Sequence, residues 1–259
     1  MNTRMRNTVD AVYFSPTGSV RHIVQTICNA MSDSVEQTDL TPLSSSEIKK
    51  DFDASRLLVA GVPVYAGRVP APATERLSHL SGHGTPAVAV AVYGNRDYED
   101  ALRELCDTLQ RRGFCVIAAA AFVARHSIVK DIASDRPDAE DMTAIRDFAM
   151  RAADKAMRGD MTAVSVRGNF PYRKYGAIPL HPQGGRSCNL CGVCAAACPV
   201  GAIPHDRPKT TDSGRCISCM RCVESCPKHA RKTPRLKMLV ASRKVRSMCG
   251  ERRRPEIFI

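Results

Sequence analysis

The stretch VDAVYFSPTGSV, residues 9–20, joins an apolar run, a turn rich in glycine and hydroxyls, and the start of a helical pattern. The run over 9–14 predicts a strand, and the apolar spacing after the turn predicts a helix over 20–31. Small residues in such a turn let backbone N–H groups approach an anion, and the positive end of a helix favours negative charge. The stretch therefore predicts a strand, a phosphate-binding loop and a helix.

The same alternation of patterns continues to residue 159. Further strands are predicted at 35–40, 56–62, 87–93 and 114–123. Helical patterns cover about 71–80, 98–112 and 138–157. Most of these strand runs are almost wholly apolar, as in strands covered on both faces. We therefore expect an α/β fold with a doubly wound, five-stranded parallel sheet.

Ligands of such sheets bind at the carboxyl ends of the strands, near the switch in strand order. Three loops reach that edge. The candidate cofactor-binding residues in the first loop are Ser15, Thr17, Gly18, Ser19 and Val20. Those in the second and third loops are Pro63, Val64, Tyr65, Gly67, Tyr93, Gly94, Asn95 and Tyr98. The first loop lacks the lysine of a triphosphate site, so it suits one terminal phosphate, and a flat ring fits between Tyr65 and Tyr93.

At these residues the chain resembles the flavodoxin family, whose phosphate loop typically reads T/S-x-T-G-x-T. The resemblance covers about residues 8–158, and Val20 departs from it by replacing the last hydroxyl. It implies the strand order 2-1-3-4-5, FMN as the ligand, and a flavin ring held between the second and third loops. A simple helix-capping turn and ordinarily packed tyrosines are the alternatives, and Tyr98 fits packing as well as flavin contact.

Two nucleotide-binding motifs are not supported. The stretch GHGTPA, residues 82–87, fits G-x-G-x-x-A, but it precedes a strand instead of following one. The chain also has no G-x-x-x-x-G-K-[ST] sequence. NAD(P)H and ATP sites are therefore not predicted.

Eight of the twelve cysteines form two copies of C-x₂-C-x₂-C-x₃-C-P, which read CNLCGVCAAACP (188–199) and CISCMRCVESCP (216–227). In this spacing the first three cysteines of a copy bind one [4Fe-4S] cluster and the fourth binds the other. Cluster one is assigned to Cys188, Cys191, Cys194 and Cys226. Cluster two is assigned to Cys198, Cys216, Cys219 and Cys222.

Zinc is the alternative, but a zinc site has no use for a third cysteine at this spacing.

This segment resembles two-cluster bacterial ferredoxins over about residues 183–232, which implies a small α+β domain. The predicted organisation is a flavodoxin-like FMN-binding domain at 1–159, a linker at 160–182, a 2[4Fe-4S] ferredoxin domain at 183–235 and a basic tail at 236–259.

Cys28, Cys106 and Cys115 fit core packing, whereas Cys249 is either a surface residue or a reactive thiol. His126 follows the fifth strand and is either near the flavin or an ordinary loop histidine.

The net charge of +12 comes from the C-terminal part. Residues 1–159 carry 19 Lys and Arg against 20 Asp and Glu, whereas residues 160–259 carry 19 against 6. This surplus partly balances anionic cofactors and suits an acidic redox partner protein. Nucleic acid is disfavoured, because Trp is absent and aromatics make up only 5%.

The whole chain resembles fused flavodoxin–ferredoxin proteins of anaerobic prokaryotes. We expect an electron-transfer protein that passes electrons between two [4Fe-4S] clusters and FMN, with no catalytic acid or base. The alternatives are an FMN-dependent reductase of a small acceptor, fed by the clusters, and a redox-sensing binding protein. The N-terminus has no export signal, and the longest apolar run, 114–124, is too short to span a membrane, so a cytoplasmic location is expected.

Overall fold

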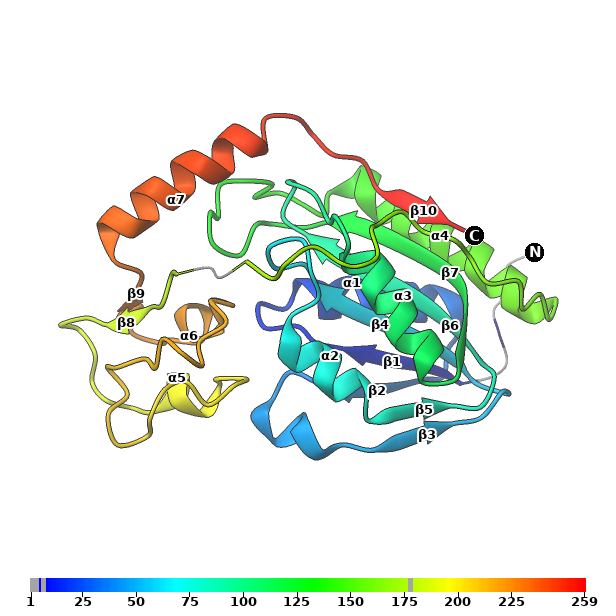
Figure 1. The fold of residues 1–259 in the computed structure, drawn as a ribbon, viewed down its shortest axis with the longest axis horizontal. Helices are drawn as coiled ribbons and strands as arrows, with labels where there is room; N and C mark the ends of the chain where they lie inside the picture. The colour runs from blue at the N-terminus through cyan, green and yellow to red at the C-terminus, as the bar shows by residue number, and fades with distance from the viewer. Residues whose placement is uncertain (1–4, 6–7, 177–178) are drawn as a thin grey trace.

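The computed structural model describes residues 5, 8–176 and 179–259. Residues 177 and 178 of the predicted linker lie outside this range. A large sheet-containing part and a smaller cysteine-bearing part lie side by side, and helix α7 (Arg235–Met248) leads from the smaller part back to the larger one (Figure 1).

Five parallel strands form the sheet. They are β1 (Val9–Tyr13), β2 (Val35–Asp39), β4 (Leu57–Pro63), β6 (Thr85–Tyr93) and β7 (Phe114–Val123). They stand in the order β2-β1-β4-β6-β7, with neighbours parallel. This is the 2-1-3-4-5 order of a flavodoxin-like doubly wound sheet, so the predicted fold class is confirmed.

A sixth strand, β10 (Glu256–Phe258), was not expected. It pairs antiparallel with β7, with Ile257 opposite Ala120. The closing EIFI of the basic tail thus covers an edge whose N–H and C=O groups would otherwise be unpaired. A short parallel pair, β3 (Lys50–Phe52) and β5 (Leu80–Gly82), was also missed, because three-residue strands carry little periodic signal.

Helices cover both faces of the sheet. One face packs against α1 (Ser19–Met31) and α4 (Ala139–Met157). Gly61 in β4 allows α1 this close, since a Cβ there would lie 2.3 Å from Val24 Cγ2. The other face packs against α2 (Ala71–Leu77) and α3 (Ala101–Arg111).

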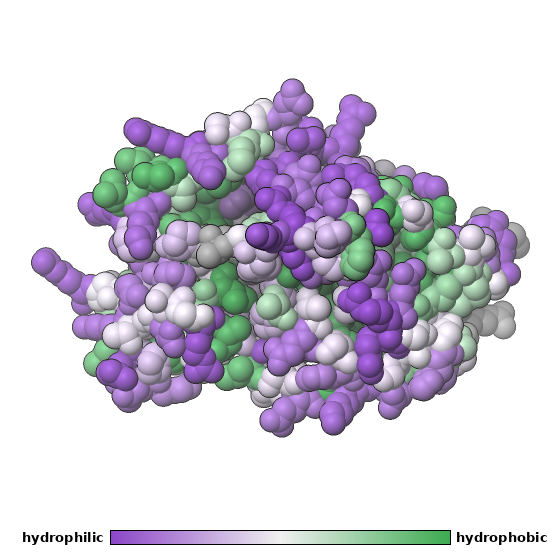
Figure 2. Space-filling model, in the orientation of Figure 1, coloured by the Kyte–Doolittle hydropathy of each residue, from purple (hydrophilic) through white to green (hydrophobic). Residues whose placement is uncertain are grey.

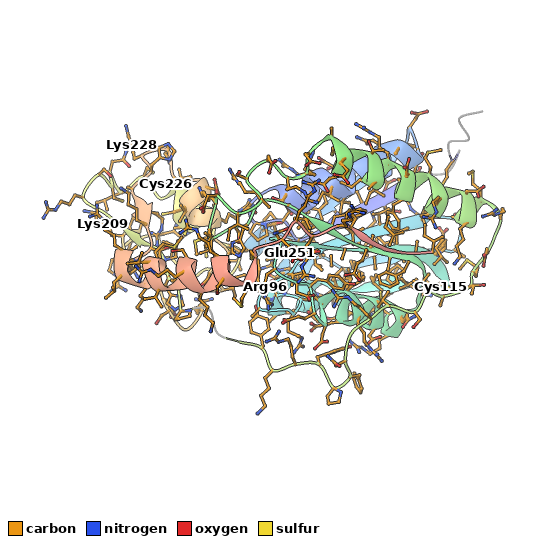
Figure 3. All side chains as sticks on the ribbon, turned by 90° about the horizontal axis from the view of Figure 1, so that it is seen from above. Arg96, Cys115, Lys209, Cys226, Lys228 and Glu251 are labelled. Carbon is orange, nitrogen blue, oxygen red and sulfur yellow. The ribbon has the colours of Figure 1, made fainter. Side chains whose placement is uncertain are left out.

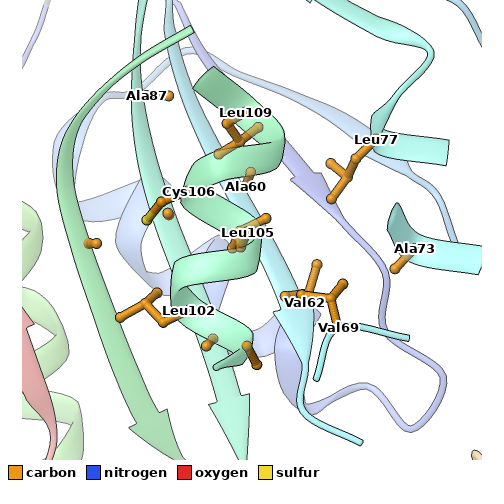
Figure 4. Packing of buried hydrophobic residues seen from close by; sticks show 14 of the residues in the cluster. Ala60, Val62, Val69, Ala73, Leu77, Ala87, Leu102, Leu105, Cys106 and Leu109 are labelled. Atoms are coloured by element: carbon orange, nitrogen blue, oxygen red, sulfur yellow. The ribbon is translucent and has the colours of Figure 1, made fainter. Parts of the chain in front are cut away.

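The apolar stripe of α3 faces the sheet in Figure 4, where Leu102, Leu105 and Leu109 lie over the strands. Cys106 lies in the same core and Cys28 in the core under α1, so both fit the predicted packing role.

The smaller part is closed by an antiparallel pair, β8 (Gln183–Gly184) with β9 (Arg231–Lys232). Between these strands lie the two cysteine motifs, each of which contains a one-turn helix, α5 (Val193–Ala196) or α6 (Arg221–Glu224). A 3₁₀ helix, η1 (Leu43–Glu47), lies in the sheet part, and the Leu43 side chain comes within 3.3 Å of where a Cβ on Gly201 would stand.

Candidate functional site: two cysteine-lined cavities and a neighbouring cleft

The two cysteine motifs follow one backbone path. Left-handed residues recur at the same offset in both copies. Their φ angles are 62° and 53° at Leu190 and Ser218, and 74° and 63° at Gly192 and Met220. Only one of these four residues is glycine, so the wrap is imposed by the fold around the thiols at the cost of some backbone strain.

In both copies the sulfur of the fourth cysteine accepts a backbone N–H from the residue four positions further along the chain. Ala202 N lies 3.2 Å from Cys198 Sγ, and Ala230 N lies 3.3 Å from Cys226 Sγ. Such bonds favour the charged thiolate that iron requires.

The structure gathers the eight cysteines around two cavities. The first is lined by Cys188, Cys191, Cys194 and Cys226. The second is lined by Cys198, Cys216, Cys219 and Cys222. In each cavity the fourth cysteine comes from the other copy, as in the two sets inferred from the spacing. Within the described ranges, no three His, Cys, Asp or Glu side chains converge on one point as a single metal ion would require; the sulfurs surround a space instead.

The surroundings of the two copies differ. In the first copy Cys191 is exposed, and Leu190 and Val193 are 57% and 40% exposed. In the second copy Cys219 and Met220 are buried, at 8% and 5% exposed. Burial raises the pKa of Cys219 to about 12. The second copy is therefore enclosed, whereas the first meets solvent.

The second copy is enclosed because it packs on the sheet part. Ile217 contacts the core beneath α3. Arg221 Nη1 donates to the carbonyls of Ser15 and Pro16 in the first loop, at 3.4 and 3.3 Å. Lys130 Nζ lies 2.8 Å from Glu224 Oε1. The motif that lines the second cavity thus touches the predicted phosphate loop.

A buried arginine, Arg76, also connects the sheet part to the cysteine-bearing part, and we call this set of contacts the junction. Its Nη2 donates to Pro199 O at 2.5 Å, and its Nη1 donates to the carbonyls of Leu40, Thr41 and Pro42. Burial lowers the pKa of its guanidinium. Sequence reasoning missed Arg76, because an arginine on an amphipathic helix suggests a solvent-exposed position.

The predicted phosphate loop is partly open to a ligand and partly paired within the protein. Gly18 adopts φ 90°, and a Cβ on it would meet nothing within 4 Å. Ser15 Oγ accepts from Arg21 N at 2.9 Å, which caps the start of α1. Val20 is buried in the core, so only its backbone can face a ligand. Thr17 and Ser19 are partly exposed.

A cleft of about 820 Å³ is lined by residues from the loops that follow β4, β6 and β7. Five of the predicted flavin residues line it: Val64, Tyr65, Gly67, Tyr93 and Gly94. Its volume lies within the range of about 300–1,000 Å³ typical of small-molecule sites. The first-loop residues and Pro63 are not part of its wall.

Two other predicted residues hold the C-terminal segment instead of lining the cleft. Tyr98 is fully buried; its hydroxyl donates to Glu256 Oε2 at 2.5 Å and accepts from Arg167 Nε at 2.7 Å. Asn95 Nδ2 donates to Glu251 O at 2.8 Å, and its Oδ1 accepts from Arg253 N at 3.0 Å.

Two tyrosines form the inner wall of the cleft. Burial raises the pKa of Tyr65 well above its usual value, and the neighbouring Cys219 and Tyr175 add to that rise. Burial, with help from Glu256, raises the pKa of Tyr93 to about 12. Both phenols therefore stay neutral at ordinary pH, and Tyr65 lies near Cys219, which lines the second cysteine cavity.

His126 also lines the cleft. Its ring packs so closely on Gly94 that a Cβ there would lie 2.6 Å from His126 Cδ2. Its Nδ1 accepts from the backbone N–H groups of Ile128 and Val129, both at 3.1 Å, which places the proton of the neutral ring on Nε2. Burial lowers the pKa of His126 to about 4. The cleft wall thus includes a neutral N–H donor.

Helix α7 forms the opposite wall of the cleft. Its residues Leu236 and Val240 line the cleft and are 75% and 62% exposed, and Lys237 and Lys244 lie beside them. Figure 2 shows the hydrophobic atoms gathered on this helix. Figure 3 places Arg96 of the cleft near Glu251, where α7 gives way to the final segment. The predicted tail is therefore an ordered wall of the cleft.

Comparisons with known proteins cover each part separately. Residues 187–230 match the family described as "4Fe-4S dicluster domain". A 64-residue stretch, 25% of this chain, is 39% identical to "Putative electron transport protein YccM" of Escherichia coli strain K12. That stretch spans only 18% of the E. coli protein.

Several solved structures are similar to part of the chain. A flavodoxin from the domain Archaea has a TM-score of 0.39 at 12% identity, covering 58% of this chain and 99% of its own. A flavodoxin of Streptococcus pneumonia TIGR4 has a TM-score of 0.38 at 17% identity, covering 57% and 99%. The apo form of the NADH:FMN oxidoreductase EMOB has a TM-score of 0.40 at 14% identity, covering 59% and 89%.

The strand order and the match of the cysteine segment together define the class of protein. The chain fuses a flavodoxin-like fold to a ferredoxin-type 4Fe-4S domain. Among the described residues, every helix is too short or too polar to cross a membrane.

Proposed function

We propose that this chain transfers electrons between two [4Fe-4S] clusters and one FMN. The observation that carries the proposal is the placement of the second cysteine cavity beside Tyr65, a residue that also lines the cleft. When bound, such clusters accept and release single electrons, and FMN accepts and releases one or two. The chain would then convert between one- and two-electron chemistry.

The side chains fit the proposed cofactors. Four cysteines surround each cavity, and backbone N–H groups point at Cys198 and Cys226. For FMN, Tyr65 and Tyr93 would flank the ring, and the open first turn of α1 would receive the phosphate. Arg221 supports this position, because its buried Nε has no hydrogen-bond partner among the described residues and its Nη1 already touches the loop.

We assign the first cysteine copy to the external partner. Its exposed face carries Leu190 and Val193, and the nearby Lys209 and Lys228 project beside Cys226 at the end of the molecule remote from Cys115 (Figure 3). Apolar contacts surrounded by positive charge suit an acidic one-electron carrier protein. The residues at 160–182 and 236–259 would act as connector and cleft wall between domains at 1–159 and 183–235.

Anaerobic purification followed by iron, sulfide and flavin counting tests the cofactors. We expect about eight irons and one FMN per chain. Zinc in place of iron, or no flavin after reconstitution, would contradict the corresponding half of the proposal.

Stopped-flow reduction by a small acidic ferredoxin tests the partner. The double variant Lys209→Glu/Lys228→Glu should slow the second-order rate at least about tenfold at low salt, with the difference shrinking as salt rises. A matched control, Lys49→Glu/Arg146→Glu, reverses two exposed charges on the sheet part and should change the rate little. Equal slowing in both variants would contradict the assigned face.

A second function is favoured by the cleft itself. Its volume of about 820 Å³ and its open, partly apolar α7 wall leave room beside a flat ring for a small acceptor. An FMN-dependent reductase would use that room. Steady-state oxidation of the reduced protein by a panel of small acceptors, compared between wild type and Val240→Trp, distinguishes the two, because only a reductase loses turnover when the cleft is filled.

A further inference from the structure

Arg231 is a buried arginine between the two cysteine cavities. It begins β9, directly after the second motif, and is 1% exposed. Its Nη1 donates to Cys194 Sγ at 3.6 Å and to Pro208 O at 2.5 Å. Its Nη2 donates to Pro182 O at 2.5 Å and to Thr211 Oγ1. The side chain is therefore held rigidly, with one N–H aimed at a predicted cluster ligand.

Among the residues that the structure describes, the charge of Arg231 has no compensating carboxylate. Within the part of the chain that the structure describes, its oxygen partners are two carbonyls and a hydroxyl, all neutral. Its Nε is also buried and has no partner there. A guanidinium remains charged under all ordinary conditions, and a buried charge is costly unless an opposite charge lies close by. The position thus calls for an anionic group nearby.

The sulfur ligands on both sides supply that anion. Arg231 lines the first cavity together with Cys194. The second set is also close, because its Cys222 lies in the same buried cluster as Cys194. A [4Fe-4S] cluster with four thiolates carries a net charge of about −2, and net charge and hydrogen bonds to sulfur set its potential.

We propose that Arg231 is an internal counter-ion shared by the two clusters and that it raises their reduction potentials. The inference rests on the proposed function, since it requires both clusters. One-electron reduction adds one negative charge and no proton to a cluster. A fixed cation and an N–H···S bond therefore stabilise the reduced form more than the oxidised form. The effect should be greatest for the cluster held through Cys194.

Potentials of the full-length, cluster-loaded protein test this role. Wild type, Arg231→Gln and Arg231→Lys are titrated anaerobically with dithionite and followed by EPR, after iron and sulfide counting of each. Arg231→Gln should lower the equilibrium constant for reduction of at least one cluster tenfold or more, which is about 59 mV for a one-electron couple. Arg231→Lys keeps the charge but loses the fork of donors, so its potential should fall between the two.

Two controls separate charge from structure. Lys232→Gln removes the same formal charge from the exposed neighbouring residue and should leave both potentials within error. Thr211→Val removes a neutral partner of the guanidinium and keeps the charge, so it should also leave them unchanged. A purely structural role would instead make Thr211→Val resemble Arg231→Gln.

Each outcome decides a different point. Arg231→Gln protein with full iron and unmoved potentials would overturn the counter-ion role and leave the proposed function intact. If Arg231→Gln fails to retain eight irons, Arg231→Lys decides: this variant keeps the charge, so a fall of about 59 mV or more in its potentials would overturn the counter-ion role. Wild-type protein without iron–sulfur clusters would overturn the proposed function and this inference together.

Discussion

The two cysteine motifs share one spacing and one backbone path, yet they occupy different surroundings. The copy at 188–199 exposes Cys191 and Leu190 to solvent, whereas the copy at 216–227 buries Cys219 and Met220 against the sheet part. Since the local geometry repeats, the difference comes from what lies outside each motif. This arrangement would suit the proposed electron carrier, because one cluster would meet a partner while the other would lie near the cleft.

The largest difference between the two copies should appear when one predicted cluster ligand is removed from either copy. Cys219→Ala and Cys191→Ala should each reduce iron from about eight to about four per chain. Because Arg221 of the second copy contacts the first loop, Cys219→Ala should also speed amide hydrogen exchange in the loop at 14–19 at least about tenfold. Cys191→Ala should leave that exchange unchanged. Equal exchange in the two variants would show that the second copy does not support the loop.

The second-largest difference between the two copies should be in the rate at which their cysteines react with an alkylating reagent. When iron is stripped from the protein under native conditions, Cys191 should be alkylated by iodoacetamide about ten times faster than Cys219, because burial raises the pKa of Cys219 to about 12 and the thiolate is the reactive form. Timed alkylation read by peptide mass spectrometry measures both rates. Comparable rates would mean that the second copy opens freely from the sheet part.

The junction itself can be weakened through Arg76. Arg76→Met should lower the free energy of unfolding by about 2–4 kcal/mol, because the carbonyls of Leu40, Thr41 and Pro199 lose a buried donor. Arg146→Met, on the exposed side of α4, should change it by less than about 0.5 kcal/mol. Urea unfolding of both variants provides the comparison, and a small effect of Arg76→Met would weaken the case for a rigid junction.

The smallest difference between the two copies should be in the change of stability when a left-handed residue of each is replaced by glycine. Met220→Gly relieves a positive φ but removes a buried side chain, so it should destabilise the protein by about 1–2 kcal/mol. Leu190→Gly relieves a similar φ at a side chain that is 57% exposed, so it should be neutral within about 1 kcal/mol. Thermal unfolding of the loaded variants measures both effects. The reverse order would mean that Met220 packing contributes little.

Sequence patterns accounted for most of the fold and part of the candidate site. The apolar runs predicted four of the five strands of the parallel sheet, because strands covered on both faces can hold few polar residues, whereas the edge strand β2 was predicted from a weaker, more polar pattern. The loops predicted for the flavin divided into two groups. Tyr65 and Tyr93 line the cleft, whereas Asn95 and Tyr98 are occupied by the C-terminal segment. Residue type alone did not show which of these loop residues line the cleft and which hold the C-terminal segment.

The charged residues were the least predictable from sequence. Arg221 and Arg231 contributed to the basic surplus of residues 160–259, which suggested cofactor balance or partner binding, and Arg76 lies on an amphipathic helix, which suggested an exposed position. The structure places Arg76 at a buried junction, Arg221 against the phosphate loop and Arg231 between the cysteine cavities. Each position depends on segments far apart in the chain, which no local pattern records.

The sequence by itself determined the two cysteine sets and the alternation of strands and helices. Ligand spacing and apolar periodicity are local properties, so they can be read within about a dozen residues. Only the tertiary structure decided which motif faces solvent, that the tail forms β10 and a wall of the cleft, and which arginine lies between the cavities. These outcomes depend on long-range packing, and identical local motifs can meet different neighbours.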